Sequence, residues 1–232
     1  MLRGYVKFDE KDIMLVNIKK NIARFIKPRG KISILSELKP GSRILDIGCG
    51  NEQAKKIKKI LPDCYYVGID VGYYNNTNSI MADEFHIVDP SDFTDFISKM
   101  SDDYDLIISS HNLEHCNDRY GTVSAMCKCI RQNGMIFIST PSEYTVNFPT
   151  RVGTLNYFDD DTHVDKPLDH SKVLKLFGKN DVEVIFSTKS YKPILGYMIG
   201  FLFEPFSRIS KKVKFATWMY WGFEQIFIGR KL

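Results

Sequence analysis

Two short segments of the chain combine residue types that suit a ligand containing a nucleoside. The first is a glycine turn, Gly48-Cys49-Gly50, directly after the apolar run 44–47. Glycine lets the backbone approach a ligand where a Cβ atom would clash, and free N–H groups at a following helix start favour an anion. The second is Asp70, which ends another apolar run 20 positions beyond Gly50. A carboxylate at that place can accept hydrogen bonds from both ribose hydroxyls.

NAD is the obvious alternative ligand for this pattern. Its fingerprint, G-x-G-x-x-G, has a third glycine, and the corresponding position here is Gln53. The sequence therefore gives poor support to a helix start that binds a pyrophosphate.

The elements that must position these residues alternate between strand and helix patterns from residue 43 onward. Helices are predicted over 9–27, 32–38, 53–61, 122–130 and 171–177, and a loop over 72–78. Strands are predicted over 43–47, 65–70, 85–88, 105–109, 135–139, 182–187 and 224–229. Repeated strand–helix units imply a mostly parallel sheet with helices on both faces. Ligands of such sheets bind beyond the carboxyl ends of the strands, where the glycine turn and Asp70 stand.

Length and composition predict one globular domain over residues 1–232, with a helical N-terminal segment over 1–40. The net charge is +4, too small an excess to imply a nucleic-acid partner. Five cysteines without a C-x-x-C pair argue against a disulfide framework or a cysteine-rich zinc site. The start has no signal-peptide core, and the longest apolar run, 194–203, is short of the roughly 20 residues of a membrane-spanning helix. We therefore expect a cytoplasmic protein with reduced thiols.

Four ordered segments resemble the class I S-adenosylmethionine-dependent methyltransferases. They are 46–50, Asp70, 105–115 and 131–136, and together they span roughly residues 40–145. The resemblance implies a Rossmann-like, seven-stranded, mostly parallel sheet whose last strand runs antiparallel, with S-adenosylmethionine as the cofactor.

The resemblance also implies which residues bind this cofactor. Gly48 and Gly50, with Cys49 between them, would border its methionine part, and Asp46 would orient the amino group. Asp70 would hold the ribose. The remaining expected contacts are the adenine amino group with Asp89, and the cleft near the methyl group with Ser110 and His111.

The string His111-Asn112-Leu113-Glu114-His115 also matches H-x-x-E-H, the zinc-site order of inverted zinc proteases. On a helix, His111 and His115 would share one face. However, the string directly follows an apolar strand, and the methyltransferase resemblance predicts a similar Leu-Glu-His string here. We therefore expect no metal site. His115 is either a general base near the methyl acceptor or a structural histidine at a helix start.

A second string, Asp159-Asp160-Asp161-Thr162-His163-Val164, follows the fifth predicted strand. A Thr-His pair before a predicted helix resembles a methyltransferase subgroup associated with glycan and cell-surface polymer biosynthesis. His163 is then a candidate base for an acceptor hydroxyl. The alternative is a solvated acidic loop with a capping histidine.

Residues 192–222, the cap segment, stand between the last two predicted strands. They combine apolar, basic and aromatic residues. We expect a helical cap over the substrate cleft, and a membrane-surface element is the alternative.

Together these observations predict O-methylation of a sugar or glycan-biosynthesis acceptor. Three alternatives remain open: methylation of a quinone-like or other small molecule, a cofactor-binding domain without activity, and the zinc protease of His111, Glu114 and His115.

Overall fold

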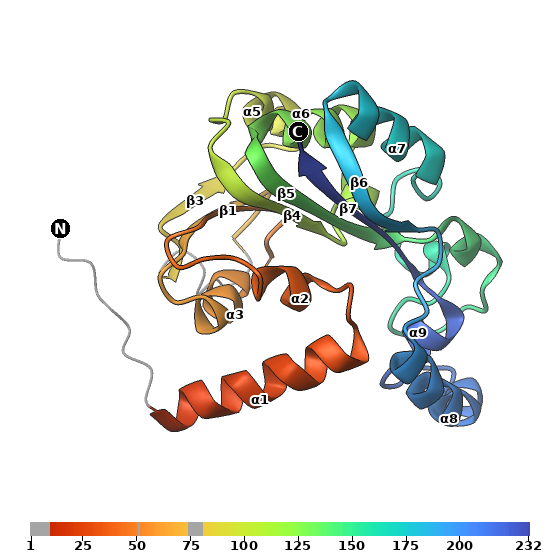
Figure 1. Cartoon of the computed structure of the whole chain (residues 1–232). Coiled ribbons are helices and arrows are strands. Elements are labelled where there is room, and N and C mark those ends of the chain that lie inside the picture. Colours follow the sequence, from red (N-terminus) through yellow and green to blue (C-terminus); the bar gives the residue numbers. More distant parts are fainter. Residues whose placement is uncertain (1–9, 51, 74–80) are drawn as a thin grey trace.

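The computed structural model describes residues 10–50, 52–73 and 81–232 (Figure 1). Its centre is a seven-stranded sheet in the order β3-β2-β1-β4-β5-β7-β6. The strands are β1 (Arg43–Ile47), β2 (Tyr65–Asp70), β3 (Glu84–Ile87), β4 (Tyr104–Ser110), β5 (Ile130–Pro141), β6 (Val182–Thr188) and β7 (Glu224–Lys231). The first five pair in parallel, and β7 runs antiparallel to both β5 and β6. The predicted fold class is therefore confirmed.

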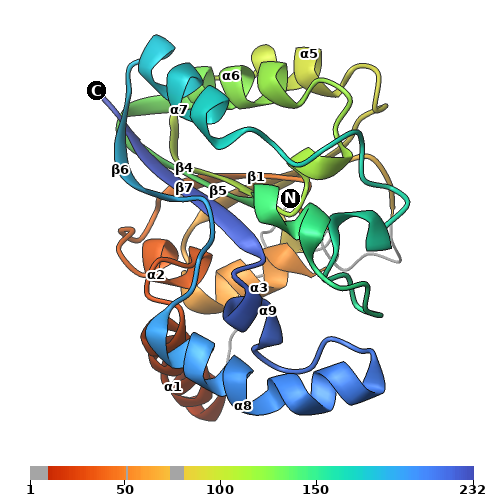
Figure 2. The same cartoon turned by 90° about the vertical axis from the view of Figure 1, so that its right-hand side faces the viewer.

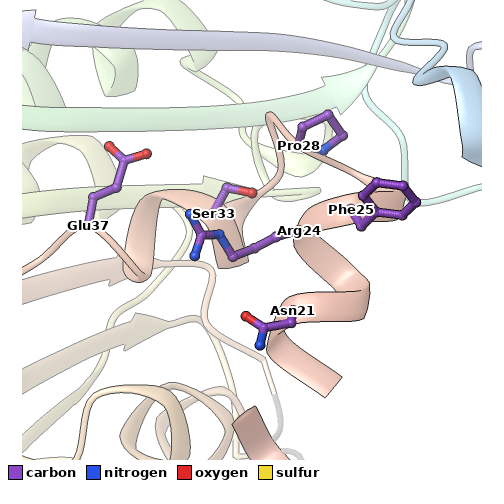
Figure 3. A pocket seen from close by; sticks show the side chains of 6 residues that line it. All are labelled: Asn21, Arg24, Phe25, Pro28, Ser33 and Glu37. Carbon is purple, nitrogen blue, oxygen red and sulfur yellow. The ribbon is translucent and has the colours of Figure 1, made fainter. Parts of the chain in front are cut away.

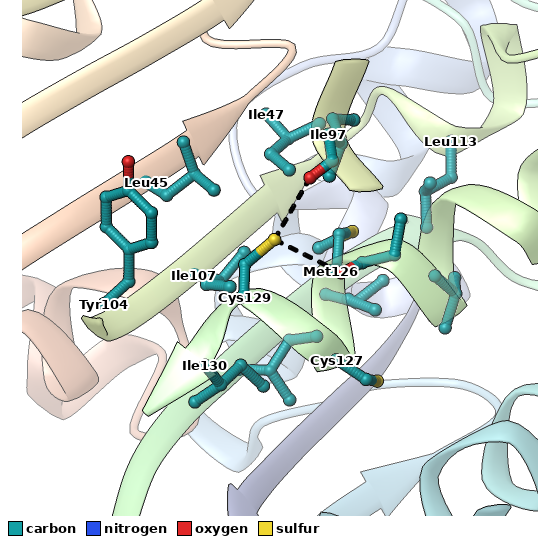
Figure 4. Close-up of a cluster of buried hydrophobic side chains, with 14 of the residues drawn as sticks. Leu45, Ile47, Ile97, Tyr104, Ile107, Leu113, Met126, Cys127, Cys129 and Ile130 are labelled. Atoms are coloured by element: carbon teal, nitrogen blue, oxygen red, sulfur yellow. Dashed lines mark hydrogen bonds between the residues drawn. The ribbon is translucent and has the colours of Figure 1, made fainter. Parts of the chain in front are cut away.

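Helices cover both faces of this sheet (Figure 1). The helices are α1 (Glu10–Ile26), α2 (Lys31–Leu35), α3 (Gln53–Ile60), α5 (Phe93–Ser98), α6 (Arg119–Cys129), α7 (His170–Lys179), α8 (Ile194–Ser210) and α9 (Thr217–Trp221), with short 3-10 turns η1 (Leu113–His115), η2 (Glu143–Asn147) and η3 (Tyr157–Asp159). On one face, α5, α6 and α7 bury side chains such as Ile97, Met126 and Phe177 against the sheet (Figure 4). On the other face, α2 and α3 bury Leu35 and Ile57.

Several elements differ from the sequence-based expectation, among them α2, which ends at Leu35 rather than at residue 38. Helix α5 was not predicted, because its six residues are too few for helical periodicity to emerge. Strand β5 begins at Ile130 rather than at residue 135, since Ile130 pairs with Tyr104 across an irregularity in the ladder. The loop predicted over 72–78 lies for the most part outside the described residues.

The cap segment forms α8 and α9 between β6 and β7 (Figure 2). Because β7 is antiparallel, its first residue, Glu224, lies beside the carboxyl ends of the parallel strands. Helix α9, which precedes β7, therefore also lies near these strand ends. None of the helices in the described ranges is long and apolar enough to cross a membrane.

Candidate functional site

The glycine turn is held together by Asp70. One carboxylate oxygen of Asp70 accepts a hydrogen bond from the Gly50 backbone N–H (2.6 Å), and the other accepts one from Val71 (2.7 Å). Each carboxylate oxygen has two lone pairs, so Asp70 retains acceptor capacity for ligand hydroxyls. The adjacent strands β1 and β2 thus bring the turn and the acid together, as the sequence predicted.

The two glycines of the turn serve different purposes. Both have positive φ, which favours glycine. A Cβ atom at Gly48 would overlap the side chain of Asn112, so this position must be glycine for packing alone. By contrast, no described atom lies within 4 Å of a Cβ built at Gly50, which leaves open space for a ligand to approach its backbone.

Asp46 precedes the turn and Cys49 lies within it, and both side chains are buried. Asp46 is 1% exposed and accepts a hydrogen bond from the Tyr66 hydroxyl (2.9 Å). Burial raises the pKa of this carboxyl, whereas the Lys31 ammonium and the Tyr66 hydroxyl oppose the rise. The Cys49 thiol is also buried, and its burial raises its pKa. Cys49 can therefore face a ligand through its backbone only.

Asp89 lies just beyond β3 and is exposed. Its carboxylate accepts hydrogen bonds from the backbone N–H and the hydroxyl of Ser91, at 2.9 and 2.7 Å. These two bonds lower the pKa of Asp89. In this arrangement the side chain stabilises the turn before α5, and its role toward adenine stays a prediction.

Ser110 ends β4, and His111 directly follows it. The Ser110 hydroxyl contacts that of Ser139 on β5 (3.0 Å). His111 has a left-handed backbone with φ of 53°, and its ring nitrogens contact Glu114 (3.2 Å) and Glu224 (2.8 Å). Glu224 also forms an ion pair with Lys27. These four residues, Lys27, Glu224, His111 and Glu114, are the charge network.

The charge network shifts the pKa of two of its members. Burial by itself would lower the pKa of His111, but the carboxylates of Glu114 and Glu224 raise it to about 10. Burial likewise would raise the pKa of Glu224, but Lys27 and His111 lower it to about 2. His111 is therefore an imidazolium at neutral pH, and both of its nitrogens are occupied, so it is unsuited to bind a metal.

His115 and His163, the histidine pair, lie with ring centroids 4.9 Å apart. Nδ1 of His163 contacts the Tyr157 carbonyl oxygen (2.6 Å), which can only accept a hydrogen bond. Nδ1 of His115 contacts the hydroxyl (2.9 Å) and carbonyl oxygen (3.3 Å) of Thr162. In its neutral form, each ring would therefore carry the proton on Nδ1 and present the Nε2 lone pair. This is the tautomer that a general base needs.

A buried carboxylate completes this group. Glu114 is 1% exposed, and in the described part of the chain its Oε2 has no hydrogen-bond partner. One ring nitrogen of His115, one of His163 and one carboxylate oxygen of Glu114 lie within 4.8 Å of one another. A buried polar atom without a partner indicates a place for a polar group of a ligand or a water.

Comparisons with known proteins identify the family of the chain. A family profile described as a methyltransferase domain matches residues 17–185. The chain belongs to this family. It is a class I S-adenosylmethionine-dependent methyltransferase, which confirms the resemblance seen in the sequence.

Solved structures show the same fold. A SAM-dependent methyltransferase from Archaeoglobus fulgidus is 18% identical with a TM-score of 0.55, over 93% of this chain and 94% of the other. An S-adenosylmethionine-dependent methyltransferase from Mesorhizobium loti is 14% identical (TM-score 0.56; 87% and 97% covered). Phosphoethanolamine N-methyltransferase 2 from Haemonchus contortus, in complex with S-adenosyl-L-methionine, is 13% identical (TM-score 0.56; 99% and 59% covered). A search of curated proteins returns no significant match.

In this methyltransferase, the loop that carries His163 is attached to the cap segment through Arg151. The guanidinium of Arg151 is buried and donates to both carboxylate oxygens of Glu204 on α8, at 2.7 and 2.6 Å, and to the Ser207 hydroxyl (2.7 Å). Within the loop, Asp159 accepts hydrogen bonds from three backbone N–H groups, including that of Arg151 (3.0 Å). Asp159 thus shapes the loop, and its carboxylate is not directed at an acceptor.

A row of aromatic rings connects the cap segment to the charge network. Trp218 of α9 stacks on Phe223 with ring centroids 5.6 Å apart, and Phe223 stacks on His111 at 6.0 Å. The cap segment is therefore attached to the loop that carries His163 through Arg151, and to the charge network through Phe223.

A hollow of about 320 Å³ lies elsewhere in the methyltransferase, between α1 and α2 (Figure 3). Its lining residues are Asn21, Arg24, Phe25, Pro28, Ser33 and Glu37. It contains none of the predicted site residues, so we place the functional site at the glycine turn and the histidine pair instead.

Sequence reasoning missed the partners that hold the site residues. Glu224 and Lys27 contact His111 or each other from opposite ends of the chain, and Arg151 reaches Glu204 across 53 positions. No local pattern marks these residues, because their partners are distant in sequence. The Leu-Glu-His string drew attention to Glu114, but the string does not show that the Glu114 side chain is buried.

Proposed function

We propose that the methyltransferase binds S-adenosylmethionine at the glycine turn. Gly50 lets the methionine part approach the backbone, Asp70 accepts hydrogen bonds from the ribose hydroxyls, and Asp46 orients the amino group. The cofactor supplies an activated methyl group on a positively charged sulfur. The chain's own residues align the acceptor with that methyl group, which is mainly a task of positioning.

We propose that the acceptor is a hydroxyl of a sugar or of a glycan-biosynthesis intermediate. In the transfer, the bond from sulfur to the methyl carbon breaks as the bond from the acceptor oxygen forms, and S-adenosylhomocysteine leaves. The hydroxyl proton must go to a base. The observation that carries this proposal is the histidine pair, which lies beside the buried carboxylate of Glu114 and has the Nδ1 atom of each ring held by a neighbouring oxygen.

His163 is the better placed of the two candidate bases. Its side chain is 5% exposed, and its Nε2 lies 3.9 Å from Asp160, which would stabilise the imidazolium formed by proton uptake. His115 is exposed, and Thr162 links it to Asp160, since the Thr162 hydroxyl donates to that carboxylate (2.5 Å). We assign proton removal to His163 and support of its charge and orientation to its neighbours.

The cap segment belongs to the acceptor side of this proposal. It would close over the cleft and exclude water from the transfer. Lys211, Lys212 and Lys214 supply cations for the phosphate of a lipid-linked or nucleotide-linked sugar. A quinone-like acceptor would need no such cations, which is why we rank it second.

Release of S-adenosylhomocysteine in the presence of a panel of sugars, nucleotide-linked sugars and quinols tests the proposal. His163→Gln should lower kcat about 10²- to 10⁴-fold with a hydroxyl acceptor, while the affinity for S-adenosylhomocysteine stays unchanged. His86→Gln on β3 is the matched control and should retain turnover. Turnover with a quinol alone would favour the second acceptor class, and full activity of His163→Gln would exclude this base.

A further inference from the structure

Helix α8 divides sharply into a packed face and an exposed face. On the packed face, Gly196 and Gly200 are buried, and a Cβ atom at either position would overlap Met219 or Ala216. These glycines let α8 lie close against the α9 region. Glu204 and Ser207 of the same face contact Arg151. The inner side of α8 is therefore fully used by contacts with the rest of the chain.

The exposed face of α8 is apolar along the whole helix. Six residues form this apolar stripe, and their exposed fractions range from 57% to 83%. The members are Ile194, Met198, Phe201, Leu202, Phe206 and Ile209. Their positions in the 3.6-residue helical repeat place them on one side of a helix about 25 Å long. A continuous apolar surface of this kind is unusual on a protein that meets only water.

Charge at both ends of the stripe is positive. Lys192 precedes α8, Arg208 lies in its last turn, and Lys211 and Lys212 follow it. All four side chains are exposed. None of them forms an ion pair with an acid in the described ranges within 4.0 Å. Between Ser190 and Phe223 the only acid is Glu204, which pairs inward with Arg151. The outer surface of the cap segment thus presents apolar and basic groups and no acid.

Helix α1 also carries exposed apolar side chains. It contacts α8, and Figure 2 shows both helices at the same end of the molecule. Ile18, Ile22 and Phe25 are exposed on α1 and share one side by their spacing. The exposed cations Lys19 and Arg24 stand among them.

We infer that this end of the methyltransferase lies on the surface of a bilayer that contains anionic phospholipid. The apolar stripe would enter the boundary between headgroups and acyl chains, and the flanking cations would meet lipid phosphates, as in interfacial amphipathic helices. A second copy of the chain fits less well. Both ends of the stripe are basic, so either relative orientation of two stripes would bring like charges together.

The inference deepens the proposed function and rests on it in one respect, that the acceptor is a glycan intermediate carried by a membrane lipid. Phe223 and Glu224 directly follow α9, and they contact His111. A bilayer under α8 would therefore present a lipid-linked acceptor next to the carboxyl edge of the sheet, where the site is.

Sedimentation of the full chain with vesicles tests the inference. We expect binding to vesicles of phosphatidylcholine with one fifth phosphatidylglycerol, and much weaker binding to phosphatidylcholine alone. The double variant Leu202→Glu/Ile209→Glu should lower the partition coefficient about tenfold or more. Lys211→Gln/Lys212→Gln should lower it about fivefold for each lysine removed. Both changes affect exposed side chains, so the fold should be retained, which the melting temperature can verify.

Matched controls are Ile185→Glu on β6 and Lys175→Gln on α7, which change exposed residues away from the cap segment and should bind like the wild type. The inference is wrong if the wild type does not bind anionic vesicles, or if the partition coefficient falls equally in the control and stripe variants. It is also wrong if the wild type forms a dimer that does not bind vesicles and that the double glutamate variant dissociates. The proposed function fails independently, if vesicles are bound but no glycan hydroxyl is methylated.

Discussion

The proposed cofactor side and the proposed acceptor side of this methyltransferase are built in different ways. Around the glycine turn, the decisive contacts join residues 20 positions apart, Gly50 with Asp70 and Asp46 with Tyr66. On the acceptor side, Arg151 reaches Glu204 across 53 positions and His111 reaches Glu224 across 113. One strand–helix–strand unit is enough to form the first region. The second forms only when most of the chain is in place.

This difference predicts that the two sides can be damaged separately. Substitutions at the glycine turn should affect cofactor affinity and leave the acceptor side folded. Substitutions that detach the cap segment should affect stability or transfer and leave the cofactor site in place.

The largest effect is expected for Arg151→Met. This change leaves the Glu204 carboxylate partly buried without its ion pair, which destabilises a fold by about 3–5 kcal/mol. Urea unfolding measures the change in the free energy of unfolding. Arg131→Met breaks the exposed pair with Asp105 and should cost at most about 1 kcal/mol. Equal losses in both variants would show that Arg151 does not attach the cap segment.

A second, smaller effect is expected for Asp70→Ala. Removing the carboxylate eliminates a charge-assisted pair of ribose hydrogen bonds, and the affinity for S-adenosylhomocysteine should fall by about 1.5–3 kcal/mol. Calorimetry gives this number directly. Asp102→Ala, an exposed acid before β4 at the opposite edge of the sheet, should not change the affinity. Binding of NADH in place of S-adenosylhomocysteine would contradict the assignment of the cofactor site.

The charge network predicts a pH dependence of stability. The pKa of His111 rises from an ordinary 6.5 to about 10 in the folded protein, so its stabilising contribution is fully present below pH 6.5. The contribution then declines as the pH rises toward 10. The melting temperature should therefore fall between pH 7 and pH 10, and the fall should be shallower in His111→Asn, since asparagine tolerates the left-handed backbone. The same slope in both proteins would show that another group is responsible.

The smallest effect is expected from metal removal. The zinc alternative needs His111 and His115, but both nitrogens of His111 contact carboxylates. Treatment with a chelator should leave turnover unchanged, and metal analysis of protein purified without chelator should give no stoichiometric zinc. One metal ion per chain, lost in both His115→Ala and His163→Ala, would instead assign it to Glu114 and the histidine pair.

The sequence predicted that the glycine turn and Asp70 lie together, but it gave the surroundings of the histidines only in outline. Asp70 and the glycines were found because strand ends and turn residues are local patterns. His115 and His163 were named separately, but nothing in the sequence indicated that their rings would be neighbours. The apolar stripe was expected to bury against the domain as a cap, yet helical spacing alone cannot tell which side of α8 faces its own protein. The two buried glycines settle that point through packing that only the fold reveals.

The position of β7 has a consequence for how the chain matures during synthesis. β7 follows β6 in the chain, but it lies between β5 and β6 in the sheet. Until residues 224–232 emerge, β6 has no strand to pair with, and His111 lacks its Glu224 partner. A nascent chain can assemble the glycine turn with Asp70 early, whereas the acceptor side must wait for β7. Ribosome-stalled chains that end before residue 224 should therefore expose one edge of β5 to chaperones.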